Sequence, residues 1–316
     1  MSTMRAVVLS PEVEGRLAIK EVAVPTPLPS ETLVRVAAVS LNRGEVRTAM
    51  TTETVPRPGW DLAGTVLQAA ADGSGPPAGA RVVGLVRTGA WAEQAAVPTN
   101  QLAQLPDSVT FAQAATLPVA GLTAMHAVWK GGFLLERPVL VTGATGGVGD
   151  YALQLAHLVG AKVVASVRRP EQAALAHESG AEYVAVGEDL AEARPYGPYA
   201  LIVESVGGKV LADALTMLDE KSIVVLFGAS SGVSVTFDAM KFYRTGQATL
   251  CGMFVFDELR TVESAARGLK RLADLIAQGR LKPRISVEES WEKVASVAKQ
   301  LMERSYPGKA VLHIGD

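Results

Sequence analysis

Short apolar runs alternate with longer mixed segments through the second half of the chain. The mixed segments have the helical or irregular pattern of connections between strands. This alternation, which begins near residue 120, predicts an α/β domain built on a doubly wound parallel sheet. Its six expected strands lie near residues 139–142, 162–167, 182–186, 200–204, 222–227 and 248–256.

The N-terminal part of the chain has a different pattern. Up to about residue 118 it consists of short β segments, such as 5–9, 32–40 and 81–85, separated by turns rich in proline and glycine. Such a pattern predicts an all-β domain of barrel-like form. After the α/β region we expect a helix over 264–278, a loop that contains proline, a helix over 291–302 and a final strand over 309–314.

A glycine-rich turn joins the first strand of the parallel sheet to a helix. The strand Val139–Val141 leads into Gly143–Gly149, after which apolar residues recur at helical spacing. Gly146 lets the backbone approach a pyrophosphate, Gly149 lets the helix pack on the strand, and the N–H groups of the first helical turn face the anion. Isolated glycines also form ordinary turns, but here the strand, turn, helix and second strand follow the order of a dinucleotide-binding unit. The predicted pyrophosphate contacts are Ala144, Thr145, Gly146, Gly147 and Val148.

The end of the second strand indicates which dinucleotide binds. An NAD site has a carboxylate there to accept from the ribose 2′-hydroxyl, whereas this chain has Ser166, Val167, Arg168 and Arg169. Two guanidinium groups suit a 2′-phosphate, so Ser166, Arg168 and Arg169 are predicted to contact NADPH. The alternative is a solvated turn in front of Pro170.

Composition sets limits on the class of protein. The chain has 316 residues, 48% hydrophobic and 20% charged, with a net charge of −2, which is typical of a soluble globular protein long enough for two domains. The small net charge gives no indication of a nucleic acid or membrane partner. No apolar run is long enough to span a membrane and no signal peptide is evident, so we expect a cytoplasmic protein. Cys251 stands alone in an apolar stretch and is expected to be buried.

A series of short motifs runs along nearly the whole chain in a specific order. They are Ser40–Asn42, Pro58–Gly64, Gly89–Glu93, Leu117–Ala124, Ala144–Gly149, Val206–Gly208 and Pro307–Lys309. Through them the chain resembles the medium-chain dehydrogenase/reductases, and specifically their zinc-independent quinone oxidoreductase branch. The resemblance implies a GroES-like β-barrel domain over residues 1–118 that is completed by 257–316. It also implies a Rossmann domain over 119–256 and an active-site cleft between the two.

The resemblance also implies roles for individual residues. Thr123 would lie near the nicotinamide carboxamide and Asn42 at the cleft wall, and these two are the predicted catalytic residues. The alternatives are a helix-start hydroxyl for Thr123 and a turn former for Asn42. The remaining implied cofactor contacts are Ser205, Gly228, Ala229 and Ser230 in the groove, with Met253, Phe254 and Val255 near the nicotinamide.

The chain departs from the family pattern at positions that bind the cofactor and at positions that bind zinc in zinc-dependent relatives. A lysine often found beyond the second strand aligns with Gln172, and a tyrosine often found near the next strand aligns with Gly187. In zinc-dependent relatives a ligand histidine occupies the position of Trp60, and here no cysteine lies near Ser40. The four histidines show no ligand spacing, so no metal site is predicted.

The absence of a predicted metal narrows the chemistry. Reduction of a simple ketone places a full negative charge on one oxygen, which needs zinc or a strong donor. Hydride delivery to an enone or quinone spreads that charge, so orientation and a hydrogen bond to the carbonyl suffice. Arg43 or Arg47 could polarise the carbonyl, with a solvated charged loop as the alternative. The sequence does not identify the proton donor.

We therefore predict an NADPH-dependent reductase of quinones or α,β-unsaturated carbonyl compounds. One alternative is an enoyl-thioester reductase. Such reductases often place a tyrosine proton donor in the segment 47–57, which is short here and contains no tyrosine, and this argues against the alternative. Another is a non-catalytic NADPH-binding protein. The apolar last strand of the sheet, expected over 248–256, predicts pairing with a second copy to form a homodimer.

Overall fold

The chain forms two compact units. The computed structural model describes residues 2–13, 15–52 and 57–315. Unit 1 comprises Met1–Leu122 and Val262–Asp316, and unit 2 comprises Thr123–Thr261. The domain boundaries expected from the sequence lie a few residues earlier, at 118/119 and 256/257, and they stay predictions.

Unit 2 is built on a six-stranded parallel sheet in the order β10-β9-β8-β11-β12-β13. The predicted sheet is therefore confirmed. All six residues of β11 are buried, which explains why the inner strands are uninterrupted apolar runs. The strands are β8 (Pro138–Val141), β9 (Lys162–Val167), β10 (Tyr183–Val186), β11 (Tyr199–Glu204), β12 (Leu218–Leu226) and β13 (Thr249–Gly252).

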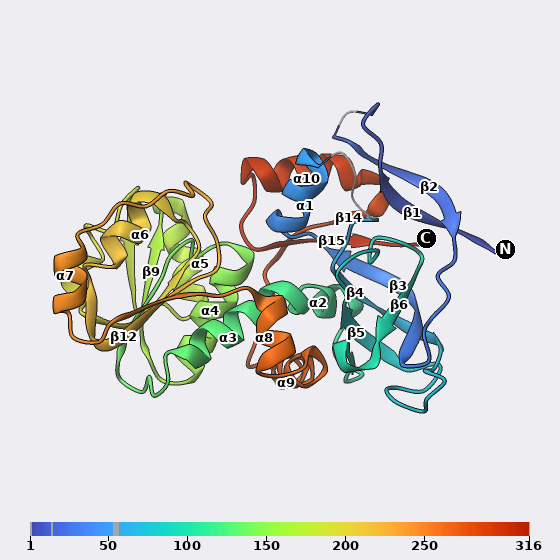
Figure 1. Ribbon diagram of the computed structural model, residues 1–316, viewed down its shortest axis with the longest axis horizontal. Coiled ribbons are helices and arrows are strands. Elements are labelled where there is room, and N and C mark those ends of the chain that lie inside the picture. The colour runs from blue at the N-terminus through green and yellow to red at the C-terminus, as the bar shows by residue number, and fades with distance from the viewer. Residues whose placement is uncertain (1, 14, 53–56, 316) are drawn as a thin grey trace. The chain divides into compact units, whose positions relative to one another are not determined.

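Helices cover both faces of this sheet (Figure 1). The chain passes from β8 outward through β9 to β10, then returns to β11 and passes outward on the other side. Because such crossovers are right-handed, the two directions place their helices on opposite faces. The helices of this region are α3 (Leu122–Lys130), α4 (Gly147–Leu158), α5 (Ala173–Glu178), α6 (Gly208–Ala214), α7 (Ala239–Arg244) and α8 (Val255–Thr261), with 3₁₀ turns at Pro170–Gln172 and Arg194–Tyr196.

The last strand of the sheet is shorter than predicted. A strand over 248–256 was expected, but β13 ends at Gly252 and α8 begins at Val255. Val255 and Phe256 are apolar because they are buried in a helix, a case that an apolar run does not distinguish from a strand. The expectation of a buried Cys251 is also wrong, because β13 is an edge strand and leaves this side chain partly exposed.

Unit 1 contains a mixed seven-stranded sheet and a separate two-stranded one. The larger sheet has the order β14-β15-β3-β4-β5-β7, with β6 also paired to β3, and β1 pairs with β2. The C-terminal β15 pairs with the N-terminal β3, so the two ends of the chain share one sheet. The strands are β1 (Thr3–Leu9), β2 (Leu17–Ala23), β3 (Glu31–Ser40), β4 (Asp61–Gln68), β5 (Arg81–Leu85), β6 (Gln94–Pro98), β7 (Leu102–Gln104), β14 (Ile285–Ser290) and β15 (Lys309–His313).

The prediction that residues up to 118 are all β is wrong in two places. The segment after Asn42 forms α1 (Arg43–Thr51), because the Asn42 N–H donates to the Glu45 side chain (2.8 Å) and caps the helix. Thr110 and Gln113 cap the short α2 (Phe111–Ala115) reciprocally, because each side chain accepts from the other residue's backbone N–H. The remaining helical segments of unit 1 are a π-helical turn at Leu117–Gly121, α9 (Ala265–Ala277), α10 (Val294–Glu303) and 3₁₀ turns at Thr99–Gln101 and Trp291–Lys293.

The predicted proline-containing loop near 283 also contains an unexpected strand, β14. Its residues alternate between half-buried and exposed, so the apolar signal of this edge strand is weak. The expected C-terminal helices and final strand are present as α9, α10 and β15. Within the described ranges, no helix is both long and apolar enough to cross a membrane.

Candidate functional site

The order of the strands indicates where unit 2 would bind a ligand, namely at the carboxyl ends of β8 and β11. Successive connections diverge between β8 and β11, so their carboxyl ends are neighbours with no helix crossing between them. In open α/β sheets, ligands bind at this switch point. The predicted cofactor residues of the β8–α4 loop and of the ends of β9, β11, β12 and β13 all follow strands at this edge.

The loop from β8 to α4 is a backbone cradle. Gly143 has a positive φ of 57°, and a Cβ atom on Gly149 would lie 2.3 Å from the Gly143 carbonyl oxygen. Only glycine therefore fits at position 149. Gly146 is exposed and immediately precedes α4, where the N–H groups of the first turn have no partner within the helix. The geometry fits the pyrophosphate of a dinucleotide.

A buried carboxylate organises the two central strand ends. Glu204 is fully buried at the end of β11 and accepts hydrogen bonds from the N–H groups of Val206 (2.8 Å) and Gly207 (3.1 Å), and from the Thr142 hydroxyl (3.2 Å). Burial raises the pKa of Glu204, and these hydrogen bonds oppose the rise. The N–H of Ser205 in turn donates to the Thr142 hydroxyl (3.1 Å), which holds Ser205 at the crevice.

The ends of β12 and β13 lie close to the same loop. A Cβ atom on Gly228 would lie 2.8 Å from the Ser205 carbonyl oxygen, and the Ser230 N–H donates to that oxygen (3.2 Å). The predicted groove residues Ser205 and Gly228–Ser230 are thus brought together. Met253 and Val255 are each 5% exposed, whereas Phe254 is 53% exposed.

The two arginines after β9 have different surroundings. Both are exposed, but the Arg169 Nε atom pairs with a Glu171 carboxylate oxygen at 3.2 Å. Among the described residues, the Arg168 guanidinium forms no hydrogen bond or ion pair. No carboxylate precedes Glu171 in this turn. Ser166 is 9% exposed, and its carbonyl oxygen accepts from the Ala144 N–H (3.3 Å), which links the β9 end to the cradle.

The two predicted catalytic residues lie in different units. Thr123 is in α3 of unit 2 and is 5% exposed, and within the described part of the chain its hydroxyl has no hydrogen-bond partner. Asn42 caps α1 in unit 1 and is half-buried. Their catalytic roles stay predictions.

Asn42 belongs to a buried polar cluster, which consists of Asn42, Glu45, Asp61 and Lys309. The Asn42 amide nitrogen donates to Glu45 Oε1 (2.9 Å) and to Asp61 Oδ2 (2.8 Å), and its oxygen accepts from Lys309 Nζ (2.6 Å). Lys309 also donates to the Leu41 carbonyl oxygen (2.9 Å) and lies 3.6 Å from Asp61 Oδ2. Both amide N–H groups of Asn42 are therefore used inside the protein.

The hydrogen bonds indicate how the cluster is charged. Burial lowers the pKa of Lys309, but its ammonium group donates two hydrogen bonds and lies 3.6 Å from the Asp61 carboxylate, which supports the ammonium form. Burial raises the pKa of Asp61, but Asp61 faces that ammonium group and accepts from the Asn42 amide and the Val119 N–H (3.0 Å), so we assign it as the ionised carboxylate. Glu45 Oε2 has no partner among the described residues, and burial together with the Asp61 charge raises the pKa of Glu45 to about 8.

Of the two arginines that were expected in a charged loop, one has a structural role. Arg43 donates to the carbonyl oxygens of Leu301 (2.8 Å) and Met302 (3.3 Å) and so joins α1 to the end of α10. Arg47 is exposed on α1. Part of the predicted segment 47–57 falls at 53–56, outside the described residues.

The sequence interpretation missed the buried polar residues that support the site. These are Thr142 and Glu204 in unit 2, and Glu45, Asp61 and Lys309 in unit 1. A signal was present, since Glu204 ends an otherwise apolar strand and Asn42 with Glu45 forms a capping pattern. What could not be seen locally is that Asp61 and Lys309 meet.

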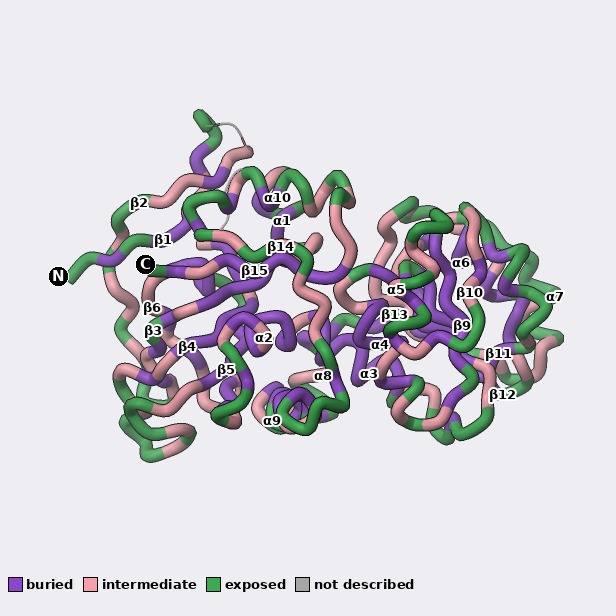
Figure 2. The backbone as a smooth tube through the Cα atoms, turned by 180° about the vertical axis from the view of Figure 1, so that it is seen from behind, coloured by how far each residue is buried: buried purple, intermediate pink, exposed green. Residues whose placement is uncertain are grey.

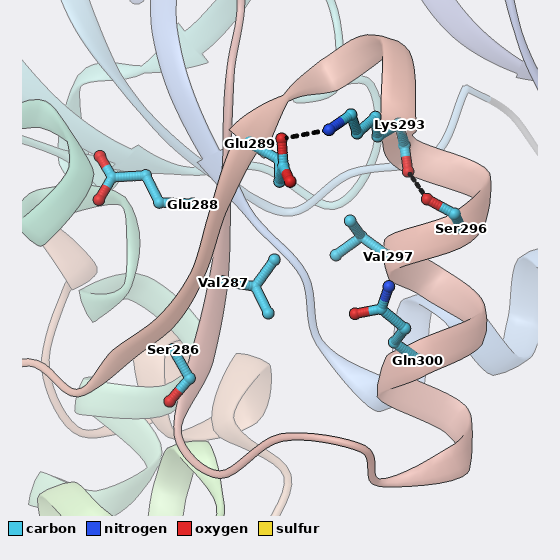
Figure 3. Close-up of a pocket in the computed structure, with 8 residues that line it drawn as sticks. All are labelled: Ser286, Val287, Glu288, Glu289, Lys293, Ser296, Val297 and Gln300. Atoms are coloured by element: carbon cyan, nitrogen blue, oxygen red, sulfur yellow. Dashed lines mark hydrogen bonds and ion pairs between the residues drawn. The ribbon is translucent and has the colours of Figure 1, made fainter.

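A cavity of about 300 Å³ lies between β14 and α10 in unit 1 (Figure 3). Its charged residues Glu289 and Lys293 pair with each other (2.8 Å), and Glu288 pairs with His313 (2.7 Å). None of the predicted site residues lines this cavity. In the part of the chain that the structure describes, no group of three or more His, Cys, Asp or Glu side chains is arranged to hold a metal ion.

Two family models match the chain. The alcohol dehydrogenase GroES-like domain matches residues 28–107, and the zinc-binding dehydrogenase model matches residues 147–271. The first lies in unit 1, and the second covers most of unit 2 and continues into α9.

Curated relatives match over most of their length. The chain is 30% identical over 325 residues to the synaptic vesicle membrane protein VAT-1 homolog of Mus musculus, covering 91% of this chain and 77% of that protein. It is 28% identical over 316 residues to the 2-methylene-furan-3-one reductase of Solanum lycopersicum, covering 92% and 74%.

Solved structures share the fold over the whole chain. A mycobacterial protein complexed with NADPH has a TM-score of 0.87 at 25% identity and covers 98% of this chain and 100% of its own. The Escherichia coli quinone oxidoreductase complexed with NADPH has a TM-score of 0.87 at 23% identity, with coverage of 99% and 100%. The predicted fold class, a Rossmann-type parallel sheet with a GroES-like domain, is confirmed.

The polar cluster predicts a pH dependence of stability. Because the pKa of Glu45 is raised to about 8 in the folded chain, the fold binds a proton that the unfolded chain releases near its ordinary value. The contribution of the protonated Glu45 to the stability of the fold is fully present below the ordinary pKa of a glutamate, and it is lost as the pH rises through about 8. Between pH 6 and pH 9 we expect the wild-type free energy of unfolding to fall by up to about 3 kcal/mol relative to Glu45→Gln.

Urea unfolding followed by tryptophan fluorescence measures this difference, since Trp60, Trp91 and Trp291 lie in unit 1. Glutamine mimics the protonated acid and does not titrate, so the variant is the matched control. Parallel pH profiles for the two proteins would contradict the assignment of the proton to Glu45.

Proposed function

The chain belongs to the quinone oxidoreductase-like branch of the medium-chain dehydrogenase/reductases, and on that basis we propose that it is an NADPH-dependent oxidoreductase of quinones or α,β-unsaturated carbonyl compounds. The observation that carries the proposal is the Arg168 guanidinium at the end of β9, which has no partner in the described ranges and stands where an NAD site requires a carboxylate. The mycobacterial neighbour complexed with NADPH supports the choice of cofactor.

Each part of the crevice has a role in this proposal. The cradle from Ala144 to Val148 holds the pyrophosphate at the start of α4. Arg168, and secondarily Arg169, pairs with the 2′-phosphate through charge-assisted hydrogen bonds. Ser205 and Gly228–Ser230 line the groove, and Thr123 with Met253–Val255 faces the nicotinamide. The bound cofactor supplies the hydride.

The substrate class follows from the side chains available in unit 1. Trp60 occupies the position of a zinc-ligand histidine in zinc-dependent relatives, so we propose acceptors that need no Lewis acid. Quinones and activated C=C bonds are such acceptors. The tomato relative is named as a reductase of 2-methylene-furan-3-one, a compound in which a C=C bond is conjugated to a carbonyl group, and this name supports the proposal.

The task of the protein in this reaction is to bind and orient. Both side-chain N–H groups of Asn42 bond to carboxylates, and Lys309 donates to its amide oxygen, which leaves at most one lone pair of that oxygen. Its proposed contribution is therefore to shape the wall rather than to donate a hydrogen bond. The Thr123 hydroxyl has no hydrogen-bond partner in the part of the chain that the structure describes, which suits a contact to the carboxamide or to a substrate carbonyl.

We also propose a homodimer that forms through the free edge of β13. Thr249, Leu250 and Gly252 are exposed along this edge strand. Next to it in sequence, α7 has no buried residue (Figure 2), and its Met240 and Tyr243 are 53% and 65% exposed. An unpaired strand beside exposed apolar side chains is the usual setting for pairing with a second copy.

The two arginines should contribute unequally to cofactor binding. A charge-assisted hydrogen bond contributes about 1.5–3 kcal/mol, so Arg168→Ala should weaken NADPH binding at least about tenfold. NADH affinity should change little, since NADH lacks the 2′-phosphate. Arg169→Ala should have the smaller effect, because Arg169 must first leave Glu171. Fluorescence titration measures the dissociation constants for NADPH and NADH. An Arg168→Ala variant with wild-type NADPH affinity would refute the proposed role of Arg168 in selecting NADPH.

The reaction itself provides a second test. Chelator-treated protein with NADPH and a simple enone should yield the saturated ketone, identified by mass and NMR. Ethanol or benzyl alcohol with NADP⁺ should give no turnover. Chelator-sensitive alcohol oxidation would instead indicate a metal-dependent dehydrogenase, and binding of NADPH without turnover of any enone or quinone would favour a binding protein.

The association state provides a third test. Light scattering at micromolar concentration should give the mass of a dimer for the wild type. Leu250→Lys places a charge on the β13 edge of each copy and should shift the protein toward monomer. Leu28→Lys, at a residue 63% exposed in unit 1, is the control and should stay dimeric. A monomeric wild type would exclude the proposed interface.

A further inference from the structure

The side chain of Gln172 connects the two loops that surround the cofactor crevice. Gln172 ends the 3₁₀ turn Pro170–Gln172 that follows the two arginines. Its Oε1 atom accepts from the backbone N–H groups of Arg168 (3.2 Å) and Arg169 (3.1 Å). Its Nε2 atom donates to the Thr145 hydroxyl (3.0 Å) in the cradle. One amide group therefore joins the turn after β9 to the loop after β8.

These bonds restrain the part of the backbone that carries both guanidinium groups. Within the described residues, the N–H groups of Arg168 and Arg169 have no acceptor other than Gln172 Oε1. The Gln172 N–H also donates to the Arg169 carbonyl oxygen (3.0 Å), so the turn closes on itself. Gln172 is half-buried and Thr145 is 7% exposed, which shields the amide from competing water.

A neutral amide side chain makes all three contacts. A glutamate could also make them, because the Thr145 hydroxyl can donate, but it would place a negative charge beside the proposed 2′-phosphate. The backbone N–H groups of Arg168 and Arg169 need an acceptor, and the Thr145 hydroxyl accepts a hydrogen bond from the same side chain. A lysine at position 172 would bring a positive charge but no acceptor, and it would leave the two N–H groups without a partner. The residue is therefore suited to hold the arginines rather than to contact the phosphate as a charge.

We propose that Gln172 is a positioning residue that sets the preference for a 2′-phosphorylated cofactor by fixing the Arg168–Arg169 backbone against the Thr145 cradle. The inference rests on the proposed function, because it assumes that the arginines bind the 2′-phosphate. An arginine on a fixed backbone loses less conformational freedom when it binds the phosphate. Loss of the Gln172 hydrogen bonds would free this backbone and so weaken the contact to the 2′-phosphate specifically.

The test compares affinities for ligands that differ only in the phosphate. NADPH against NADH, and 2′,5′-ADP against 5′-ADP, are titrated at one ionic strength into the full chain. Gln172→Leu removes all three side-chain hydrogen bonds and should weaken NADPH and 2′,5′-ADP about tenfold, with NADH and 5′-ADP within about threefold. The matched control is Gln154→Leu, since Gln154 lies on α4 and bonds to Asp150 of the same helix (2.9 Å). This control should retain the wild-type ratio.

The outcomes separate this inference from the proposed function. If Arg168→Ala loses the NADPH preference and Gln172→Leu keeps it, the positioning role of Gln172 is wrong, whereas the role of Arg168 in selecting NADPH is supported. If Arg168→Ala has no effect, the role of Arg168 is wrong, and the role of Gln172 is wrong with it. An equal loss for both cofactors in Gln172→Leu also overturns the inference, because it indicates only a structural role. Should Gln172→Leu not fold, Gln172→Asn keeps the amide but is too short to join both loops, and the same change in the ratio is expected.

Discussion

The buried ammonium group of Lys309 constrains how unit 1 closes. A charge that is 4% exposed is tolerated only where its N–H groups are all bonded and an opposite charge is near. The partners of Lys309 come from the other end of the chain, at Leu41, Asn42 and Asp61. The C-terminal strand β15 thus pairs with β3 in a register that also places Lys309 against these groups. The same bonds hold Asn42, the residue that the family motif assigns to the cleft wall.

Unit 2 also contains a buried ionisable group whose burial is compensated by hydrogen bonds, the carboxyl group of Glu204. Glu204 is fully buried, and the N–H groups of Val206 and Gly207 with the Thr142 hydroxyl satisfy it. Because a buried acceptor without partners is costly, this network fixes the turn after β11 and with it Ser205. In both units, a residue expected at the site is hydrogen-bonded to a member of a buried polar network: Ser205 to Thr142, and Asn42 to Lys309.

Features set by local rules were predictable, and those set by tertiary contacts were not. The apolar alternation and the glycine spacing identified the sheet of unit 2 and the cradle from Ala144 to Val148, because strand period and turn sterics act over a few residues. Helix α1 was missed although Asn42 and Glu45 form a capping pair, since the charged residues that follow also suit a loop. The Asp61–Lys309 pair joins residues far apart in the chain, and no local pattern predicts it.

The number of positive charges near a phosphate site does not by itself determine its selectivity. Arg168 and Arg169 are adjacent and equally charged, yet one is already paired with Glu171 and the other is unpaired among the described residues. A paired guanidinium exchanges one partner for another when an anion arrives, whereas an unpaired one gains a partner. The contribution of the unpaired one then depends on how firmly its backbone is held. In the proposed site, the selectivity of this turn is therefore a property of the hydrogen bonds around the arginines as much as of the arginines themselves.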